Sequence, residues 1–334
     1  MKLVVLIGGS SNERLVSYSS GIAIYKSLLE LNHDVILIDP ALDKQELSDD
    51  FLAQQSYKNA EYYDFHHPKH LEKLDEHLEY IAESIQPDIV FLALHGGYGE
   101  DGTVQERMDK LGIRYTGSGS EASKLAMDKN RSKRLMQENG IRTAKWITYD
   151  QKKQSKFPDI SDFGYPLIVK ANHGGSSVGL TIVHKVDDLQ AAIDLALDIE
   201  DEIMIEEYIK GREITISILN NKCYPPIEIK PKHEYYDYEC KYTKGMTEYI
   251  VPADLEPQLL DRINETALRC FQLLGLEVYG RIDFLLKPDD NYYCLEANSL
   301  PGMTETSLIP KSMGFAGLSF TEIVEQIINQ SLTK

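Results

Sequence analysis

Residues 278–298 predict a β-hairpin that brings acidic and basic side chains together. Two stretches rich in β-branched, aromatic and leucine residues flank the sequence Pro-Asp-Asp-Asn, which is typical of a tight turn. If these four residues form the turn, Asp283 lies opposite Glu296, and Arg281 lies opposite Asn298. Because side chains alternate along a strand, all four point to one face of the hairpin.

Asp283 and Glu296 would repel each other in this arrangement, because like charges directly opposite one another destabilise a sheet. A divalent ion bound by carboxylate and amide oxygens removes the repulsion, and Mg²⁺, with phosphate completing its coordination, is the usual choice. The alternative is a solvated polar face with Arg281 as a surface partner. Removing either carboxylate is expected to leave the stability of the metal-free protein unchanged. The residues expected on the opposite, apolar face are Ile282, Phe284, Leu286, Tyr293, Leu295 and Ala297.

A second candidate is the loop His-Gly-Gly-Ser-Ser-Val-Gly at 173–179, between two predicted strands. Its glycines and serines offer backbone N–H and hydroxyl groups, which suit a loop that closes over phosphate. Lys170 ends the preceding strand and adds a cation, and Lys129 is a further candidate cation. Taken alone, such a loop more often only turns a hairpin, and Lys129 is more often a surface lysine.

The segment at 203–213, which ends in the letters IEEYIKGRE, has an apolar start followed by acids. Backbone groups and a carboxylate there could bind an adenine amino group and ribose hydroxyls, with Glu213 the better ribose candidate. The alternative is an ordinary strand with solvent-facing acids. The first loop, at 8–17, lacks the G-x-G-x-x-G spacing of a dinucleotide site, so it is interpreted as a substrate loop.

These candidates need a multi-lobed α/β scaffold. Strands alternate with helices over residues 1–120, which predicts a lobe with a parallel sheet. A central lobe at 121–210 is expected to begin with a helical pattern at 121–139, with a turn at Met127-Asp128 before Lys129, and a third lobe at 211–334 contains the hairpin. Residues 43–70 are interpreted as an irregular insertion. The predicted core elements of the last two lobes are strands at 166–170, 179–184 and 202–208, helices at 189–197 and 256–274, and a charged aromatic loop at 231–249.

Composition limits the class of protein. The chain has 334 residues, of which 42% are hydrophobic, and 35 Lys and Arg against 53 Asp and Glu give a net charge of −18. Such an acid excess argues against general nucleic-acid or membrane-surface binding, because phosphate backbones and anionic lipids are repelled. No apolar run approaches the roughly 20 residues of a membrane span. The four cysteines lack CxxC spacing, so neither a zinc site nor a disulfide framework is expected. This cysteine usage fits a reducing compartment, and we expect a cytoplasmic protein.

Taken together, the motifs resemble those of the D-alanine:D-alanine ligases of the ATP-grasp superfamily. The resemblance runs from Lys2 to the C-terminal helix, apart from the insertion. It implies three α/β lobes, ATP held between the second and third, and ligation of two D-alanines through an acyl phosphate for peptidoglycan precursors. A homodimer is also implied. The motifs are GGSSNERLVSYSSG, ALHGGYGEDGTVQ, YTGSG, MDKNRSK, VKANHGGSSVG, IEEYIKGREIT, YDYECKY, GRIDFLL and EANSLPGMTETSL.

The resemblance also implies roles at the amino-acid sites. Glu13 would bind the ammonium of the first D-alanine and form a hydrogen-bonded trio with Ser176 and Tyr242 that closes the loop. Arg281 and the backbone N–H of Gly302 would stabilise the tetrahedral oxyanion. The residues expected to contact or place D-alanine are His95, Ser307 and Leu308.

Other roles concern ATP and metal. Asp283, Glu296 and Asn298 match the ligands of two Mg²⁺ ions, with Mn²⁺ as a possible substitute, which agrees with the hairpin argument. The residues expected at ATP are Lys129, Lys170 and Lys241 for phosphates, and Glu206, Ile209 and Glu213 for adenine and ribose.

Two rival functions stay open at this point. One is a ligase of the same fold with D-lactate or D-serine as acceptor. Since D-lactate ligases of the family tend to carry Phe in place of Tyr242, D-alanine is the expected acceptor, and Tyr242→Phe is expected to shift preference towards D-lactate. The other is a non-catalytic ATP-binding module, against which the set of Arg281 with three metal ligands argues.

Overall fold

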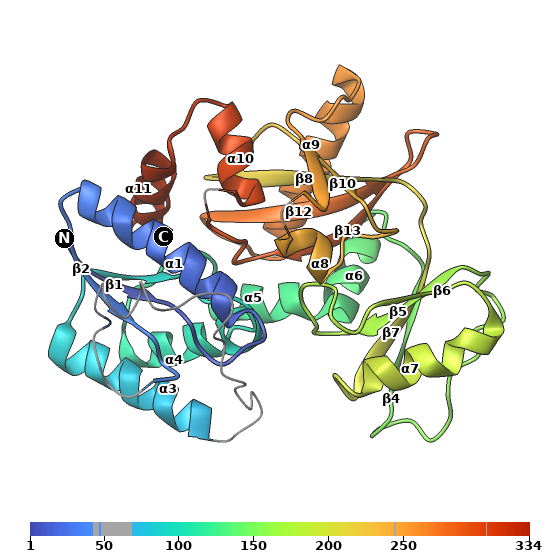
Figure 1. Cartoon of the computed structure of the whole chain (residues 1–334), viewed down its shortest axis with the longest axis horizontal. Coiled ribbons are helices and arrows are strands. Elements are labelled where there is room, and N and C mark those ends of the chain that lie inside the picture. The colour runs from blue at the N-terminus through green and yellow to red at the C-terminus, as the bar shows by residue number, and fades with distance from the viewer. Residues whose placement is uncertain (43–46, 48–68, 244, 305) are drawn as a thin grey trace.

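The computed structural model of the chain describes residues 1–42, 47, 69–243, 245–304 and 306–334, with Lys69 and Tyr242 described by their backbone alone. Most of the insertion expected at 43–70 therefore lies outside the described residues. Three sheets with their helices make up the molecule, one on the left of Figure 1, one at the lower right and one at the top. Among the helices described, none is both long and apolar enough to cross a membrane.

The first sheet is parallel, as the alternation of strands and helices predicted. Its strand order is β2-β1-β3, and every residue of β3 is buried. Such fully apolar strands form where helices cover both faces of a sheet. The elements of this lobe are β1 (Lys2–Leu6), α1 (Arg14–Glu30), β2 (Asp34–Ile38), α3 (Lys69–Tyr80), β3 (Ile89–Leu92) and α4 (Thr103–Leu111).

The chain returns to this lobe at its end. Helix α11 (Phe320–Ser331) packs along α1, so both termini lie on the same side of the molecule (Figure 1). Ser319 and Glu322 form a capping box at its start. Its buried face joins the core of the first sheet, and a further helix, α10 (Leu308–Phe315), leads into it. The division at 120 and 210 stays a prediction, but the first core includes this C-terminal helix.

The central sheet is antiparallel with strand order β4-β7-β5-β6, and the predicted helix at 189–197 is confirmed as α7 (Leu189–Leu197), which packs against β5. The helical pattern predicted at 121–139, with a turn at Met127-Asp128, is confirmed. It is two helices, α5 (Ser120–Met127) and α6 (Lys129–Glu138), because Asp128 takes an extended backbone and its carboxylate accepts from Arg131 N at 3.0 Å to cap α6. The strands are β4 (Trp146–Asp150), β5 (Leu167–Ala171), β6 (Thr181–Val183) and β7 (Glu202–Glu207).

The third sheet has the order β11-β10-β8-β12-β13, with β9 paired to β8. Helix α9 (Pro257–Leu273) packs against it through a buried apolar face. The segment at 231–249, expected as a loop, contains a short helix, α8 (Tyr238–Tyr242), and most of an edge strand. The strands are β8 (Arg212–Leu219), β9 (Lys222–Cys223), β10 (Ile227–Pro231), β11 (Thr247–Ile250), β12 (Tyr279–Leu286) and β13 (Tyr292–Asn298).

The hairpin of β12 and β13 has the predicted register at its functional end. Asp283 pairs with Glu296 and Arg281 with Asn298. Nearer the turn the prediction is wrong by one residue, because residues 287–291 form the connection and a β-bulge shifts the register after Asp283. Cys294 therefore takes the buried position expected for Leu295, which lines a cavity instead. Tyr293, also expected in the core, is only half-buried.

Candidate active site

Two adjoining cavities lie where the three sheets meet. The smaller, about 430 Å³, is lined by the first loop, the glycine-rich loop and the end of β13, and the larger, about 950 Å³, lies between the central and third sheets. Both volumes suit small-molecule ligands. The residues that line both are Lys129, Gly174, Gly175, Ser176, Tyr236, Lys241, Arg281 and Glu296.

Nearly all the residues predicted at the site gather there. Tyr242 is the exception, because its side chain lies outside the described part of the chain. Besides the shared residues, the smaller cavity is lined by Glu13, His95, Asn298, Gly302, Ser307 and Leu308. The larger is lined by Lys170, Glu206, Ile209, Glu213 and Asp283.

The glycine-rich loop connects the lobes. Ser176 donates a hydrogen bond to the Glu13 carboxylate of the first lobe, and Ser177 Oγ donates to the Tyr236 carbonyl of the third at 3.0 Å. Both serines have φ near +50°, at 48° and 58°. This conformation costs free energy in a residue with a Cβ, so the contacts of the loop must hold it.

Glu206 lies between two lysines on the floor of the larger cavity. Its Oε2 accepts from Lys170 Nζ at 2.6 Å, and its Oε1 accepts from Lys133. Burial by itself would raise the pKa of Glu206, but the two ammonium groups outweigh it and lower that pKa to about 2. The carboxylate is therefore ionised, and Lys170 is the lysine of this cluster that lines the cavity.

Lys129 is the first residue of α6 and is buried, not a surface lysine. Its ammonium donates to the Gly174 carbonyl and lies 3.4 Å from the Asn172 carbonyl, so the base of the glycine-rich loop holds it. Burial lowers its pKa. An ammonium held by neutral carbonyls keeps its charge available for an anion in the cavity.

The two facing carboxylates of the hairpin differ in their surroundings. Arg281 donates to both oxygens of Asp283 at 2.8 Å, and Thr215 and Asn298 donate to the same carboxylate at 2.5 and 3.0 Å. Within the described residues, Glu296 makes no side-chain hydrogen bond or ion pair. The sequence argument required a cation between the two carboxylates. Arg281 is the partner of Asp283, as the alternative had it, but it is largely buried; Glu296 faces both cavities with no ion pair among the described side chains.

These residues fit a magnesium site. Glu296 offers a carboxylate to both cavities, and Asn298, whose amide nitrogen donates to Asp283, has its amide oxygen left as a donor atom. Carboxylate and amide oxygens are hard ligands that suit Mg²⁺ or Mn²⁺. Glu213 is affected by the same carboxylates. Burial raises its pKa most, and Asp283 and Glu296 add to the effect, so that the pKa is about 8.

The smaller cavity has its own polar wall. His95 is buried, its Nε2 lies 2.9 Å from Ser20 Oγ, and its Nδ1 lies 3.6 Å from Glu100. Burial raises the pKa of Glu100. Ser307, which also lines this cavity, accepts a hydrogen bond from Thr304 N at 3.0 Å, and a Cβ on Gly302 would lie 3.0 Å from the Ser307 hydroxyl. Gly302 thus lets the backbone approach closely.

Sequence reasoning missed Lys133 and Thr215. Lys133 follows Lys129 by four residues, one helical turn, and this spacing could have placed both on one face of a helix. Thr215 pairs with Asp283 across β8 and β12, a contact between strands far apart in sequence that no local pattern indicates.

Comparison with known proteins matches the whole chain to one family. Residues 2–118 match the family model "D-ala D-ala ligase N-terminus", and residues 135–329 match "D-ala D-ala ligase C-terminus". The D-alanine--D-alanine ligase B of Clostridium perfringens is 39% identical over 337 residues, covering 100% of this chain and 99% of the relative. The D-alanine--D-alanine ligase of Clostridium beijerinckii is 38% identical, with 99% of each chain covered.

Solved structures agree with this match. The D-alanine--D-alanine ligase of Bacillus anthracis complexed with ATP superposes with a TM-score of 0.79 at 32% identity, covering 100% of this chain and 98% of that one. A second structure of the Bacillus anthracis enzyme gives a TM-score of 0.81 at 35% identity, with the same coverage.

Proposed function

The chain belongs to the D-alanine–D-alanine ligase family, and from that membership we propose how its residues carry out the reaction. The protein has the ATP-grasp fold and joins two D-alanines in an ATP-dependent, ADP-forming reaction whose product serves peptidoglycan synthesis. One observation carries the assignment of roles: every predicted site residue with a described side chain lines one of two joined cavities.

ATP occupies the larger cavity in this proposal. Lys129 and Lys170 bind its phosphates, with Lys241 at the wall between the cavities. Ile209 and Glu213 meet adenine and ribose. Apolar side chains such as Ile168, Ile182 and Leu295 also line this cavity, which suits a flat base.

Glu206 was expected from sequence to contact adenine, but we assign it a different main role. Both of its oxygens accept hydrogen bonds from lysines, so its chief effect is to orient Lys170 towards phosphate. Its remaining lone pairs still face the cavity.

Asp283, Glu296 and Asn298 would hold Mg²⁺ or Mn²⁺, two ions in all by family resemblance. When bound, the metal neutralises phosphate charge and orients the γ-phosphoryl group. The chain itself contributes the lysines and Arg281 near this charge. Burial alone would lower the pKa of Arg281, but the adjacent Asp283 carboxylate raises it.

The smaller cavity holds the two D-alanines. Phosphoryl transfer to the carboxylate of the first gives an acyl phosphate, and attack by the amine of the second releases phosphate. Glu13, oriented by Ser176, binds the ammonium of the first D-alanine. Arg281 and the Gly302 N–H stabilise the tetrahedral oxyanion. His95, Ser307 and Leu308 complete the walls of this cavity.

The glycine-rich loop keeps water away from the acyl phosphate. It contacts the first lobe through Ser176 and the third through Ser177, so the loop covers the junction of the two cavities. Excluding water prevents hydrolysis of a reactive intermediate.

The test is the release of ADP from ATP with and without D-alanine, together with identification of the product. ADP formation that depends on D-alanine, with D-alanyl-D-alanine as the product, is the expected result. ADP formation equal in both conditions, or a product containing D-lactate or D-serine when all acceptors are offered equally, contradicts it.

Assembly and location follow from the family resemblance. We expect a homodimer, which light scattering of the purified protein tests. A cytoplasmic site of action is expected because the reaction consumes ATP.

A further inference from the structure

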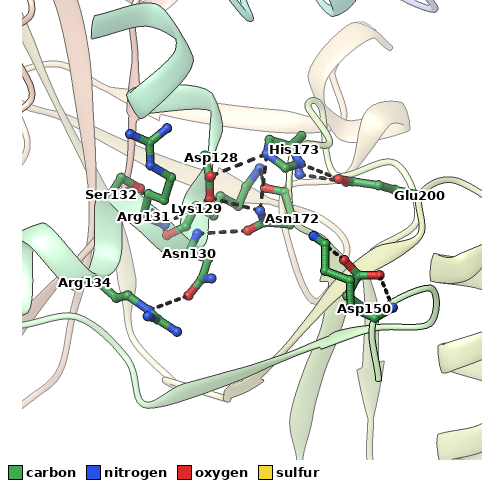
Figure 2. A network of polar contacts seen from close by, with 11 residues as sticks. Asp128, Lys129, Asn130, Arg131, Ser132, Arg134, Asp150, Asn172, His173 and Glu200 are labelled. Atoms are coloured by element: carbon green, nitrogen blue, oxygen red, sulfur yellow. Dashed lines mark hydrogen bonds and ion pairs between the residues drawn. The ribbon is translucent and has the colours of Figure 1, made fainter. Parts of the chain in front are cut away.

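A histidine at the start of the glycine-rich loop lies between two carboxylates from other parts of the chain (Figure 2). The Nδ1 of His173 pairs with Glu200 Oε1, and its backbone N–H donates to Glu200 Oε2 at 2.8 Å. On the other side, its Nε2 lies 3.6 Å from Asp128 Oδ2. Asp128 joins α5 to α6, and Glu200 precedes β7, so three separate segments meet at one imidazole.

This geometry favours the charged imidazole. A neutral imidazole can donate to Glu200 but carries no charge to attract Asp128, whereas the imidazolium pairs electrostatically with both carboxylates; its Nε2 also lies 3.4 Å from Asn172 Nδ2. Asp128 and then Glu200, against the effect of burial, raise the pKa of His173 to about 10. Lys129 is the neighbouring cation; its ammonium donates to the carbonyls of the loop and also interacts electrostatically with Glu200.

The residues on either side of His173 hold Lys129. Lys129 Nζ donates to the carbonyl of Gly174 and lies 3.4 Å from that of Asn172. The Asn172 side chain is fixed as well, since it donates to Asp128 at 3.0 Å and accepts from Asn130 N at 2.9 Å. The direction of the Gly174 carbonyl therefore depends on the backbone that His173 anchors, and the Asn172 carbonyl is fixed in addition by its own side chain.

We propose that His173 is a positioning residue for Lys129: held between Asp128 and Glu200, it fixes the two flanking carbonyls that aim the Lys129 ammonium into the wall shared by both cavities. The inference rests on the proposed binding of ATP phosphate by Lys129. His173 itself does not line either cavity within the described residues, so it acts through the lysine.

The experiment is a double-mutant cycle read by calorimetric binding of the β,γ-imido analogue of ATP with Mg²⁺. His173→Gln keeps a hydrogen-bonding side chain but cannot donate to both acids as a cation. We expect it to weaken analogue binding about 10-fold, the effect typical of losing hydrogen bonds to charged groups. In a Lys129→Met background, the same change should weaken binding less than about twofold, because nothing is left to position.

Steady-state kinetics separate positioning from a general structural effect. His173→Gln should raise the KM for ATP about 10-fold and leave the KM for D-alanine within about twofold. His173→Arg retains a cation with several donors and should restore most of the loss. Asp128→Asn keeps the helix cap while removing one of the two charges, and should reproduce part of the defect. The matched control is His33→Gln, at the edge of the first lobe, where His33 contacts the N-terminus.

The outcomes are distinct. If Lys129→Met does not weaken analogue binding, the proposed role of Lys129 fails and the inference fails with it. If Lys129→Met weakens binding but the two substitutions act additively, the role of Lys129 stands and the positioning role of His173 is wrong. Equal rises in both KM values for His173→Gln, or no rescue by arginine in a folded variant, also overturn it.

Discussion

The ammonium of Lys170 lies 2.6 Å from Oε2 of Glu206, and these two side chains keep 8% and 3% of their surface exposed. Lys133, 1% exposed, holds the other oxygen of the same carboxylate. One buried acid thus serves two buried lysines. The cluster is both a structural element of the central lobe and the positive wall of the larger cavity.

Glu206→Gln should destabilise the protein by about 3 kcal/mol, because two buried ammonium groups lose the charge that compensates their desolvation. The free energy of unfolding in urea measures this. Glu207→Gln, at the next and exposed position, is the matched control and should change stability by less than about 0.5 kcal/mol. Equal effects of the two substitutions would contradict the account of the cluster.

Lys170→Ala should raise the KM for ATP far more than the KM for D-alanine, since the lysine lines the larger cavity alone. Glu206 keeps Lys133 as its partner in this variant, so we expect the fold to persist. The measurement is initial rate against each substrate with the other saturating. Equal changes in both KM values would move Lys170 away from the nucleotide.

Glu296→Gln and Asp283→Asn should both abolish ligation but differ in stability. The sequence argument expected neither to destabilise the metal-free protein, and the structure changes this for Asp283. Asp283→Asn leaves Arg281, whose side chain is 16% exposed, without its bidentate partner, and it should lower the free energy of unfolding by about 2 kcal/mol. Glu296→Gln should lower it by less than about 0.5 kcal/mol. Urea unfolding without nucleotide or divalent ions tests stability. Activity near wild type at saturating Mg²⁺ would refute the metal assignment.

Glu213 should make the metal-free protein less stable as pH rises. Its pKa is about 8 in the folded protein against an ordinary 4.5, so the unfolded chain releases its proton first. The stabilising contribution is complete below about pH 4.5 and is lost as pH rises through 8. Glu213→Gln removes this dependence, so the unfolding midpoint of the variant should fall less between pH 5 and pH 8. Parallel midpoints for both proteins would contradict it.

The pairing of Asp283 with Glu296 was predicted correctly from sequence, but only because two errors in the predicted hairpin cancel. A four-residue turn was expected where five residues connect the strands, and the bulge at Leu295 restores the pairing of Asp283 with Glu296. A bulge has no reliable signal in a single sequence. The alternation of apolar and charged residues was strong enough to indicate the right face at one end only.

Other features depend on contacts that local patterns do not contain. A turn at Met127-Asp128 was expected from sequence, but the contacts that favour it were not. The Asp128 carboxylate accepts hydrogen bonds from Arg131 N and from the Asn172 side chain, and it lies 3.6 Å from His173. Helix α10 was missed because Pro310 interrupts its apolar pattern, although proline is tolerated in the first turn of a helix. The site residues were found through motif resemblance, but their partners came from the fold.

Because of the bulge at Leu295, some positions of β13 should tolerate a one-residue deletion during evolution and others should not. Leu295 is the extra residue between the pairs Asp283–Glu296 and Phe284–Cys294, so its deletion can be absorbed by an ordinary ladder in which Glu296 still faces Asp283. A deletion at Ala297 has no bulge to close, and it turns Asn298 away from Arg281. Lineages that shorten this hairpin should therefore do so between the turn and Glu296, and laboratory deletion of Leu295 should leave measurable ligation where deletion of Ala297 leaves none.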